Sequence, residues 1–553
     1  MINLSIEHKQ YRKYTESPTS IVSGQAFYNN KFYKNGDLAD LVSAWENPED
    51  FYTALNQLNG FYALIRHQNN ELFAAVDRVR SIPLFYGQKG NNFFLSDSAE
   101  WVRQKLGNEE LDQLAKEEFL LTGYVTGSDT LFPDVKQLQA GEAIIVKDTE
   151  QGLSVKPVRY YRFIHEYEQD KRMEELMEEH DQVLLQVFAR LIEVADGRTI
   201  VVPLSGGYDS RLIVLMLKRL GYNNVIAFSY GRPGNKESEV SRKVAELLGV
   251  RWEFVPYSNE DWYKWFNSEE RKKYWEFASG LCSLGHMQDW PAVWQLRKNK
   301  AIPDDSIFVP GHTGDFISGG HIPIEFGTIK TVTTERLIDS ILKKHYVLHN
   351  KSELATNEKR LLRNKIINLC EANESLTSIN AASAFEKWEC QERQSKFIVN
   401  SVRVYDYWEY SWYLPQWDYE YMNFWSTVPL KYRVNQAMYK PFVDNLLYTS
   451  TGCVLPRDDL NPSLTQRVKR VLTSDINYSL KDLLKRILLS NQKVRAKEYN
   501  NHPLAVWGRY ASNEESFLNL TRDQKYMILN YVNCVFYLSE LMDKTKIGNR
   551  ESR

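Results

Sequence analysis

The chain has 553 residues, of which 43% are hydrophobic and 25% are charged. This length exceeds the roughly 250–300 residues at which a single core stops growing, so we expect at least two domains in an ordinary globular protein. The formal net charge of −2 gives no overall positive field. A protein that binds nucleic acid or an anionic membrane through its general charge is therefore excluded.

The cysteines and the apolar runs indicate the compartment. The five cysteines are far apart and odd in number, and none belongs to a C-x-x-C pair, so neither a disulfide framework nor a zinc site is suggested. This usage fits a reducing compartment. No signal-peptide core and no stretch of about 18 apolar residues occurs. We expect a cytoplasmic protein that neither inserts into a membrane nor binds nucleic acid.

The first 150 residues have the character of short strands separated by turns. Residues 59–65 and 71–77 are strand-like runs on either side of a polar turn, and 91–96 and 142–146 look similar. The polar stretch 147–155 is expected to be a domain boundary. This part of the chain therefore predicts a mainly β domain.

From Thr199 onward the pattern changes. After a helical run over 174–194, the sequence predicts strands over 199–204, 225–230 and 251–255, and helices over 211–220 and 236–248. Strands that alternate with helices in this way are typical of a parallel sheet with crossover helices. From about residue 339 the pattern is mostly helical, so the second part is α/β with a large helical portion.

A glycine-rich loop follows the first of these strands, where residues 203–210 read Pro-Leu-Ser-Gly-Gly-Tyr-Asp-Ser. The glycines allow the backbone to approach an anion closely, and the backbone N–H groups converge at a helix N-terminus. Ser205 and Ser210 add hydroxyl donors. Asp209 would repel a phosphate by itself, so it is best explained as a ligand of Mg²⁺ that bridges to the phosphates. The alternative is a plain strand-to-helix turn in which serine caps the helix.

This loop resembles the Ser-Gly-Gly-x-Asp-Ser pyrophosphate loop of the ATP pyrophosphatases, and specifically the synthetase domain of the asparagine synthetase family. A second segment, 310–320, reads Pro-Gly-His-Thr-Gly-Asp-Phe-Ile-Ser-Gly-Gly and is similar to the Ser-Gly-x-Gly-x-Asp-x-x-x-Gly-Gly segment of that family. The resemblance implies that ATP and Mg²⁺ are the cofactors and that Asp209 and Asp315 hold the metal ion. It also implies that Pro310 and Gly311 lie against the nucleotide.

The end of the second strand, Phe228-Ser229-Tyr230, resembles the strand end that contacts adenine in the family, with the backbone of Tyr230 reading the base. A buried strand terminus explains the side chains equally well. The expected cofactor-binding residues are Leu204, Ser205, Gly206, Gly207, Asp209, Ser210, Phe228, Ser229, Tyr230, Pro310 and Gly311.

Residues 58–63, 77–86 and 130–132 look like the N-terminal glutaminase domain of the same family. Glutamine-dependent members use an N-terminal cysteine as nucleophile, whereas this sequence begins Met1-Ile2-Asn3 and has no cysteine before Cys282. The resemblance implies an Ntn-hydrolase-like β-sandwich over 1–160 and a parallel-sheet ATP-pyrophosphatase domain over 175–553. We expect the first domain to be structural and unable to hydrolyse glutamine.

The leading hypothesis is an AMP-forming amide synthetase that adenylates a small-molecule carboxylate and couples it to an amine or ammonia. Residues 308–315, 413–418 and 501–504 are similar to asparagine-synthetase-like proteins of bacterial surface-polysaccharide pathways, which implies a saccharide carboxylate. One alternative is an intramolecular cyclase like the β-lactam synthetases or lasso-peptide cyclases. The other is an inactive nucleotide-binding scaffold. A homodimer is left open.

Some positions depart from the family pattern. Ser411 replaces a family glutamate, and His312 replaces another within the second motif, where it is the expected acid–base residue. Family enzymes also use a late lysine to offset charge on the adenylate, and Lys440 and Lys469 are the expected catalytic candidates. Three arginines could substitute for that lysine, and two further histidines flank the expected pocket. These are Arg403, Arg433 and Arg457, and His286 and His321.

Overall fold

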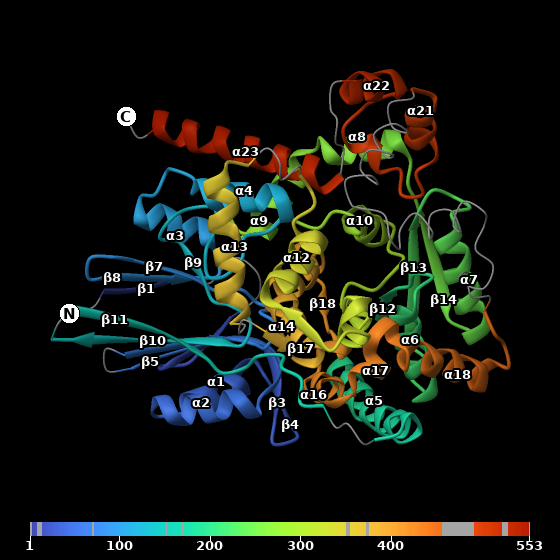
Figure 1. Cartoon of the computed structure of the whole chain (residues 1–553), viewed down its shortest axis with the longest axis horizontal. Coiled ribbons are helices and arrows are strands. Elements are labelled where there is room, and N and C mark those ends of the chain that lie inside the picture. The colour runs from blue at the N-terminus through green and yellow to red at the C-terminus, as the bar shows by residue number, and fades with distance from the viewer. Residues whose placement is uncertain are drawn as a thin grey trace.

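The computed structural model describes residues 3–7, 14–68, 71–150, 152–167, 171–349, 354–371, 375–455, 492–522 and 529–551. In the view of Figure 1, two sheets built from the N-terminal part lie on one side and a parallel sheet lies on the other. Among the described residues, none of the helices combines the length and apolarity that crossing a membrane requires.

The N-terminal part forms two stacked sheets. One has the strand order β1-β8-β7-β9, and the other has the order β11-β10-β6-β5-β3-β2 with β4 paired to β3. The bounds in the first sheet are β1 (Asn3–Glu7), β7 (Phe85–Lys89), β8 (Asn92–Ser96) and β9 (Lys136–Gln137). Those in the second are β2 (Thr15–Glu16), β3 (Ser20–Tyr28), β4 (Lys31–Lys34), β5 (Asn59–Gln68), β6 (Glu71–Val76), β10 (Glu142–Thr149) and β11 (Gly152–Arg159).

The alternation of side chains along β5 explains how these layers are held together. Ala63 and Ile65 share a buried cluster with Phe93 of β8, so they pack between the two sheets. Tyr62 and Leu64 point the other way, into a second cluster with residues of helices α1 (Asn35–Ser43) and α2 (Pro48–Gln57). The predicted β-sandwich is therefore confirmed, with helices on its outer face.

The expected boundary at 147–155 is wrong. These residues belong to the antiparallel pair β10–β11, in which Val146 is opposite Val155 and Thr149 is opposite Gly152. Asp148, Thr149, Glu150 and Ser154 are exposed, because they lie at the turn end of β10 and on the edge strand β11, and a run of exposed polar residues resembles a linker in the sequence.

The five-stranded sheet that follows the N-terminal part is parallel, as the sequence predicts. Its order is β14-β13-β12-β15-β18, formed by β12 (Ile200–Pro203), β13 (Val225–Gly231), β14 (Arg251–Pro256), β15 (Ile307–Phe308) and β18 (Ser411–Trp412). Helices α6 (Tyr208–Arg219) and α7 (Lys236–Leu248) connect the first three strands. The order reverses between β12 and β15, and sheets of this kind bind ligands at the carboxyl ends of the strands next to such a reversal.

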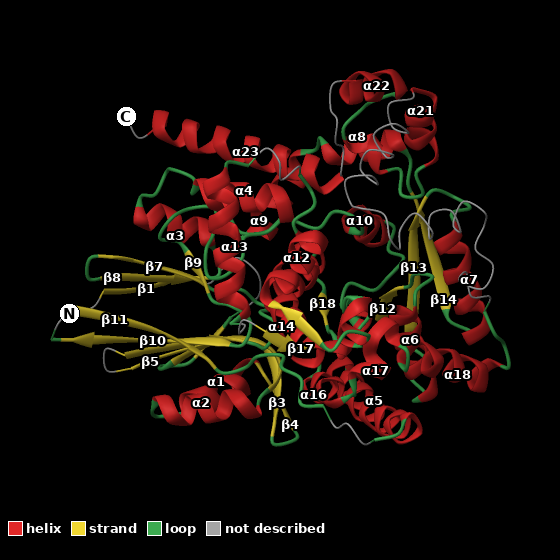
Figure 2. Ribbon diagram, viewed as in Figure 1, coloured by secondary structure: helices red, strands yellow, loops and turns green. Residues whose placement is uncertain are grey.

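Helices make up most of the remaining described chain, as Figure 2 shows. They are α3 (Ala99–Leu106), α4 (Gln113–Thr122), α5 (Met173–Ala195), α8 (Asn259–Phe266), α9 (Glu269–Ser279), α10 (Trp290–Lys298), α11 (Gly314–Ile317), α12 (Thr334–His345), α13 (Thr356–Cys370), α14 (Ser378–Glu389), α15 (Arg403–Tyr407), α16 (Tyr419–Thr427), α17 (Leu430–Arg433), α18 (Tyr439–Thr451), α21 (Gln492–Asn501), α22 (Glu514–Arg522) and α23 (Leu529–Glu551). Helix α14 continues directly into a π-helix, η3 (Cys390–Ile398). The short strands β16 (Thr331–Thr333) and β17 (Ser375–Thr377) form an antiparallel pair, with α12 and α13 between them in the chain.

The π-helix also connects the two parts of the molecule. Lys396 Nζ lies 2.6 Å from the Glu392 carboxylate, and both side chains are fully buried. Lys396 Nζ also donates to the carbonyl oxygens of Val125 and Gly127 in the N-terminal part, and Gly127 N–H donates back to Glu392. The contact between the two parts therefore includes a buried ion pair that is hydrogen-bonded to backbone.

A fully buried histidine predicts how the fold responds to acid. The ring of His180 on α5 packs among aromatic rings, with Phe442 at 4.4 Å and Trp425 at 5.1 Å between centroids. Burial lowers its pKa to about 3, so His180 is neutral in the fold and takes up a proton on unfolding below pH 6.5. Its stability contribution is complete above that pH and falls by up to about 1.4 kcal/mol per unit below it.

We expect the His180→Phe variant to lose less thermal stability than the wild type when both are taken from pH 7 to pH 5. The measurement is the thermal unfolding midpoint of each protein at the two pH values. Equal losses in the two proteins would contradict this explanation.

Candidate active site

The glycine-rich loop connects β12 to α6 at the carboxyl edge of the parallel sheet. Ser205 N–H donates to Ser210 Oγ at 3.0 Å, and Gly207 N–H donates to Ser205 Oγ at 3.1 Å. These bonds curl the backbone at the start of the 12-residue helix α6, where the helix dipole favours an anion. Ser205 and Gly207 are exposed, whereas Ser210 is buried and shapes the loop.

The second motif packs directly on this loop. A Cβ atom at Gly311 would lie 2.5 Å from the backbone nitrogen of Ser210, and one at Gly314 would overlap the carboxylate of Asp209. Asp315 N–H donates to Asp209 Oδ2 at 3.0 Å. The glycines of the second motif are therefore required for close contact, and they place Asp315 beside Asp209 although 106 residues separate them.

Asp209 and Asp315 form a site with excess negative charge. Burial and the neighbouring charge of Asp315 raise the pKa of Asp209. Burial also opposes ionisation of Asp315, but the bond from His321 outweighs it and lowers the pKa of that carboxyl. Among the described residues, no group of three or more His, Cys, Asp or Glu side chains could hold a metal ion alone. Two carboxylates beside a phosphate loop fit Mg²⁺, which keeps phosphate and water ligands.

Tyr439 at the start of α18 completes the surroundings of Asp209, although the sequence analysis did not identify it. Its hydroxyl donates to Asp209 Oδ1 at 2.9 Å, and Gln416 Nε2 donates to the same hydroxyl at 3.3 Å. Both side chains are buried. No local motif surrounds them, so only the folded chain reveals that they orient the carboxylate.

The strand end Phe228-Ser229-Tyr230 supports the loop through both backbone and side chain. Leu204 N–H donates to the carbonyl of Phe228 at 2.9 Å, and Ser229 Oγ donates to the carbonyl of Leu204 at 2.8 Å. The Phe228 and Ser229 side chains are buried, so the alternative of a buried strand terminus describes them well. The Tyr230 ring is partly exposed and stacks on Tyr257 at 5.3 Å.

His312 lies between the second motif and a polar cluster. Its Nε2 is 3.2 Å from Ser401 Oγ, and burial together with nearby His286 lowers its pKa to about 4. His286 Nε2 lies 3.5 Å from the buried carboxylate of Asp289. Both histidines are partly exposed and neutral at pH 7, so their rings can accept a proton.

The residues expected to offset the charge on an adenylate lie in different places. Lys440 follows Tyr439 on α18 and is partly exposed, whereas Lys469 and Arg457 lie outside the described residues. Arg403 is buried, pairs with Asp406 at 2.9 Å and donates to the carbonyl of Ser81. Its position is therefore structural.

Arg433 is also buried. It pairs with Glu386 at 2.8 Å and donates to the carbonyl of Ile317 at 2.7 Å. It thus supports the second motif from behind and does not reach the loop. Ser411 begins β18, opposite Ile307, so it lies away from the carboxyl edge where the two motifs meet.

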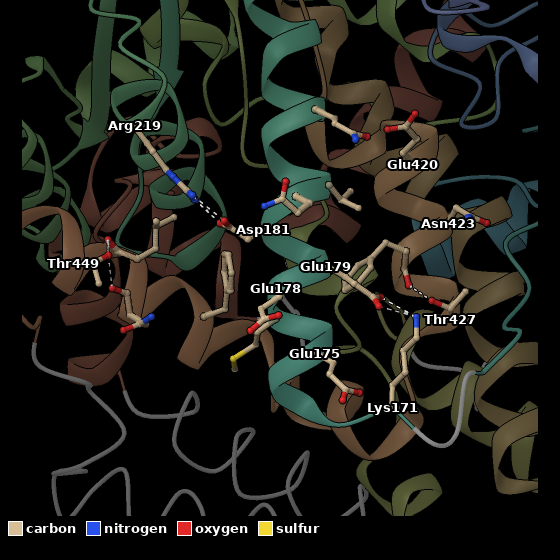
Figure 3. A pocket seen from close by; sticks show the side chains of 18 of the residues that line it. Lys171, Glu175, Glu178, Glu179, Asp181, Arg219, Glu420, Asn423, Thr427 and Thr449 are labelled. Atoms are coloured by element: carbon tan, nitrogen blue, oxygen red, sulfur yellow. Dashed lines mark hydrogen bonds and ion pairs between the residues drawn. The ribbon is translucent and has the colours of Figure 1, made fainter.

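A separate groove of about 1280 Å³ lies between α5, α16 and α18. Figure 3 shows its charged lining, including the ion pairs Arg219–Asp181 and Lys171–Glu179. None of the expected site residues lines this groove. The site at the sheet edge is therefore defined by its two motifs and not by this groove.

Comparison with known proteins agrees with the two-part architecture. Residues 26–161 match the model of the glutamine amidotransferase domain, and residues 186–268 match that of asparagine synthase. The second match contains β12, the loop, α6, β13, α7 and β14. These two domains together indicate a ligase-type enzyme.

Two curated proteins are distant relatives. A probable glutamine-hydrolysing asparagine synthetase of Acanthamoeba polyphaga mimivirus is 26% identical over 225 residues, which cover 38% of this chain and 37% of that protein. A 7-cyano-7-deazaguanine synthase of Methanocaldococcus jannaschii is 26% identical over 160 residues, covering 24% and 68%. The match to the first relative thus spans little more than a third of its length.

Solved structures are matched weakly. The NH3-dependent NAD synthetase of Campylobacter jejuni has a TM-score of 0.19 and 13% identity, covering 36% of this chain and 85% of that one. The glutamine phosphoribosylpyrophosphate amidotransferase of B. subtilis has a TM-score of 0.18 and 11% identity, covering 54% and 62%. The fold class follows from the strand orders described above. The two domain matches, in order along the sequence, and the distant asparagine synthetase relative support an asparagine synthetase family protein.

Proposed function

We propose that this protein is an ATP-dependent, AMP-forming amide synthetase. The observation that carries the proposal is the contact between the two motifs, in which the backbone N–H of Asp315 donates to the Asp209 carboxylate, and the charge of Asp315 is close enough to raise the pKa of Asp209. A substrate carboxylate oxygen attacks the α-phosphorus of ATP, and pyrophosphate leaves. An amine or ammonia then attacks the acyl carbon, AMP leaves, and the nitrogen loses a proton.

The residues of the loop have separate parts in this scheme. The N-terminal end of α6 binds the leaving pyrophosphate through its helix dipole, while the N–H groups of Ser205 and Gly207 donate to serine hydroxyls and fix the shape of the loop. Mg²⁺ on Asp209 and Asp315 would neutralise the charge that develops there. His312 accepts the proton of the amine, and Lys440 or Lys469 offsets the charge on the adenylate.

We propose the division into a glutaminase-like domain over 1–160 and a synthetase domain over 175–553, with the first lacking glutaminase activity. All five cysteines lie outside the amidotransferase match, and Cys282, Cys370, Cys390 and Cys534 are buried. No cysteine occurs before Cys282, so residues 1–281 contain no thiol nucleophile for glutamine.

With glutamine as the sole nitrogen source, we expect no glutamate above the rate without enzyme. Enzyme-coupled detection of glutamate, with ammonium chloride as the alternative donor in a parallel reaction, provides the measurement. Glutamate release that depends on this protein would refute the proposed loss of glutaminase activity.

For the substrate we propose a small-molecule carboxylate, with a saccharide acid in surface-polysaccharide synthesis as the first candidate. This rests on the resemblance of 308–315, 413–418 and 501–504 to proteins of such pathways. An intramolecular cyclase is the alternative, in which the attacking amine belongs to the same molecule as the carboxylate. A panel of sugar acids, amino acids and amino-bearing diacids separates the two.

ATP–pyrophosphate exchange, stimulated by members of that carboxylate panel, tests the proposal as a whole. Exchange requires reversible attack at the α-phosphorus and does not depend on the amine. An inactive scaffold would bind ATP in the same experiment without exchange for any carboxylate.

A further inference from the structure

His321 lies between two carboxylates and contacts both. Its Nε2 is 3.0 Å from Asp315 Oδ2, and its Nδ1 makes a short hydrogen bond to Glu389 Oε1. The His321 side chain is 16% exposed, whereas Glu389 is fully buried. The His321 ring therefore links the buried Glu389 carboxylate to the Asp315 carboxylate at the edge of the site.

Glu389 is itself held from several directions. Its carboxylate lies 3.4 Å from Lys344 Nζ, 3.4 Å from His345 Nε2 and 3.7 Å from Arg393 Nη1. Gln394 Nε2 donates to it at 3.2 Å. Lys344 Nζ also donates to the carbonyl of His321 at 2.7 Å, so the backbone and the ring of His321 are both fixed.

The same region supports the second motif at another point. Glu389 is the last residue of α14, immediately before the π-helix η3, and Gln394 lies within that π-helix. Thr313 Oγ1 donates to Gln394 Oε1 at 3.2 Å, and Thr313 has a left-handed φ of 81° at the start of α11. π-helical turns are rare and are frequently found at functional sites. The His321–Asp315 and Thr313–Gln394 contacts therefore fix the position of the second motif around Asp315.

Asp315 needs this support, because its side chain is 53% exposed. Phe316 N–H donates to its Oδ1 at 2.8 Å, and His321 is the described partner of Oδ2. Without the imidazole, the Oδ2 atom loses that partner and the carboxylate gains rotational freedom. Side chains that hydrogen-bond to metal ligands typically change metal affinity by 10–100-fold when they are removed.

We propose that His321 and Glu389 are a positioning pair that fixes the Asp315 carboxylate for the cation of the ATP site. The pair acts through Asp315 and touches neither the nucleotide nor the substrate. The inference rests on the proposed function for the metal site itself and adds the residues that orient it.

The test measures Mn²⁺ binding by electron paramagnetic resonance in the presence of ATP, with the intact chain and without carboxylate substrate. We expect His321→Ala to weaken Mn²⁺ binding by about 10–100-fold and Glu389→Gln to weaken it less. His321→Gln can still donate one hydrogen bond to Asp315, so it should recover part of the loss. His67→Gln on β5 is the matched control and should leave Mn²⁺ binding unchanged.

The outcomes distinguish the loss of the metal site itself from the loss of the positioning role alone. If the wild type with ATP binds no more Mn²⁺ than ATP alone does, the metal site and the pair are both refuted. If the wild type binds Mn²⁺ and His321→Ala binds it equally well, only the positioning role is overturned. Thermal unfolding of each variant identifies a folding defect, in which case His321→Gln and Glu389→Gln decide the question.

Discussion

Replacing Asp209 by asparagine is expected to lower carboxylate-dependent ATP–pyrophosphate exchange by about 10³-fold, because the variant loses a negative charge beside the leaving group. Asparagine keeps the shape of the side chain. Its single oxygen can still accept the bond from the backbone N–H of Asp315, and its amide nitrogen can donate to the Tyr439 hydroxyl. The loop should therefore stay folded, and the loss should appear in the rate and not in the thermal midpoint.

Asp181→Asn is the matched control for this variant. Asp181 pairs with Arg219 in the separate groove of Figure 3, away from both motifs, so its replacement should leave exchange unchanged. If Asp209→Asn kept more than a tenth of wild-type exchange, the assignment of this carboxylate to the pyrophosphate site would be wrong.

The second large effect concerns stability. Lys396→Met removes the partner of a fully buried Glu392 carboxylate and the bonds to the carbonyls of Val125 and Gly127. Breaking a buried ion pair on one side typically costs about 3–5 kcal/mol, because the remaining charge is buried without compensation. We expect a clearly lower thermal midpoint and weaker contact between the two parts of the molecule.

Two further variants distinguish the effect of breaking a buried ion pair from the effect of removing any lysine. Lys264→Met breaks the Lys264–Glu260 pair, which has the same i,i+4 spacing but side chains that are 66% and 76% exposed, and should change the free energy of unfolding by less than about 0.5 kcal/mol. Combining Lys396→Met with Glu392→Gln should recover part of the lost stability. A midpoint in Lys396→Met equal to that of Lys264→Met would contradict the account.

Contiguous motifs explain which parts of the site the sequence could predict. The loop over 203–210 and the segment over 310–320 each carry their chemistry in a few consecutive residues, and alternating strands and helices imply that both lie at the carboxyl edge of one sheet. Helix 236–248 was predicted with the bounds of α7, because Asn235 caps its start and Gly249 ends it.

The remaining parts depend on contacts between distant residues. Tyr439 lies 230 residues after Asp209, and Glu389 lies 68 residues after His321, so no spacing rule connects them. The hairpin over 147–155 was mistaken for a boundary because an exposed edge strand and a linker have similar polarity. The π-helix after Glu389 has no distinct sequence signal, since it continues a regular helix.

The products of ATP cleavage test the central claim most directly. Phosphorus-31 NMR of the complete reaction, with an accepted carboxylate and ammonium chloride, distinguishes attack at the α-phosphorus from attack at the γ-phosphorus. Our account predicts AMP and pyrophosphate in equal amounts with the amide, and about 10³-fold slower formation of both from Asp209→Asn. ADP and inorganic phosphate as the products would contradict it.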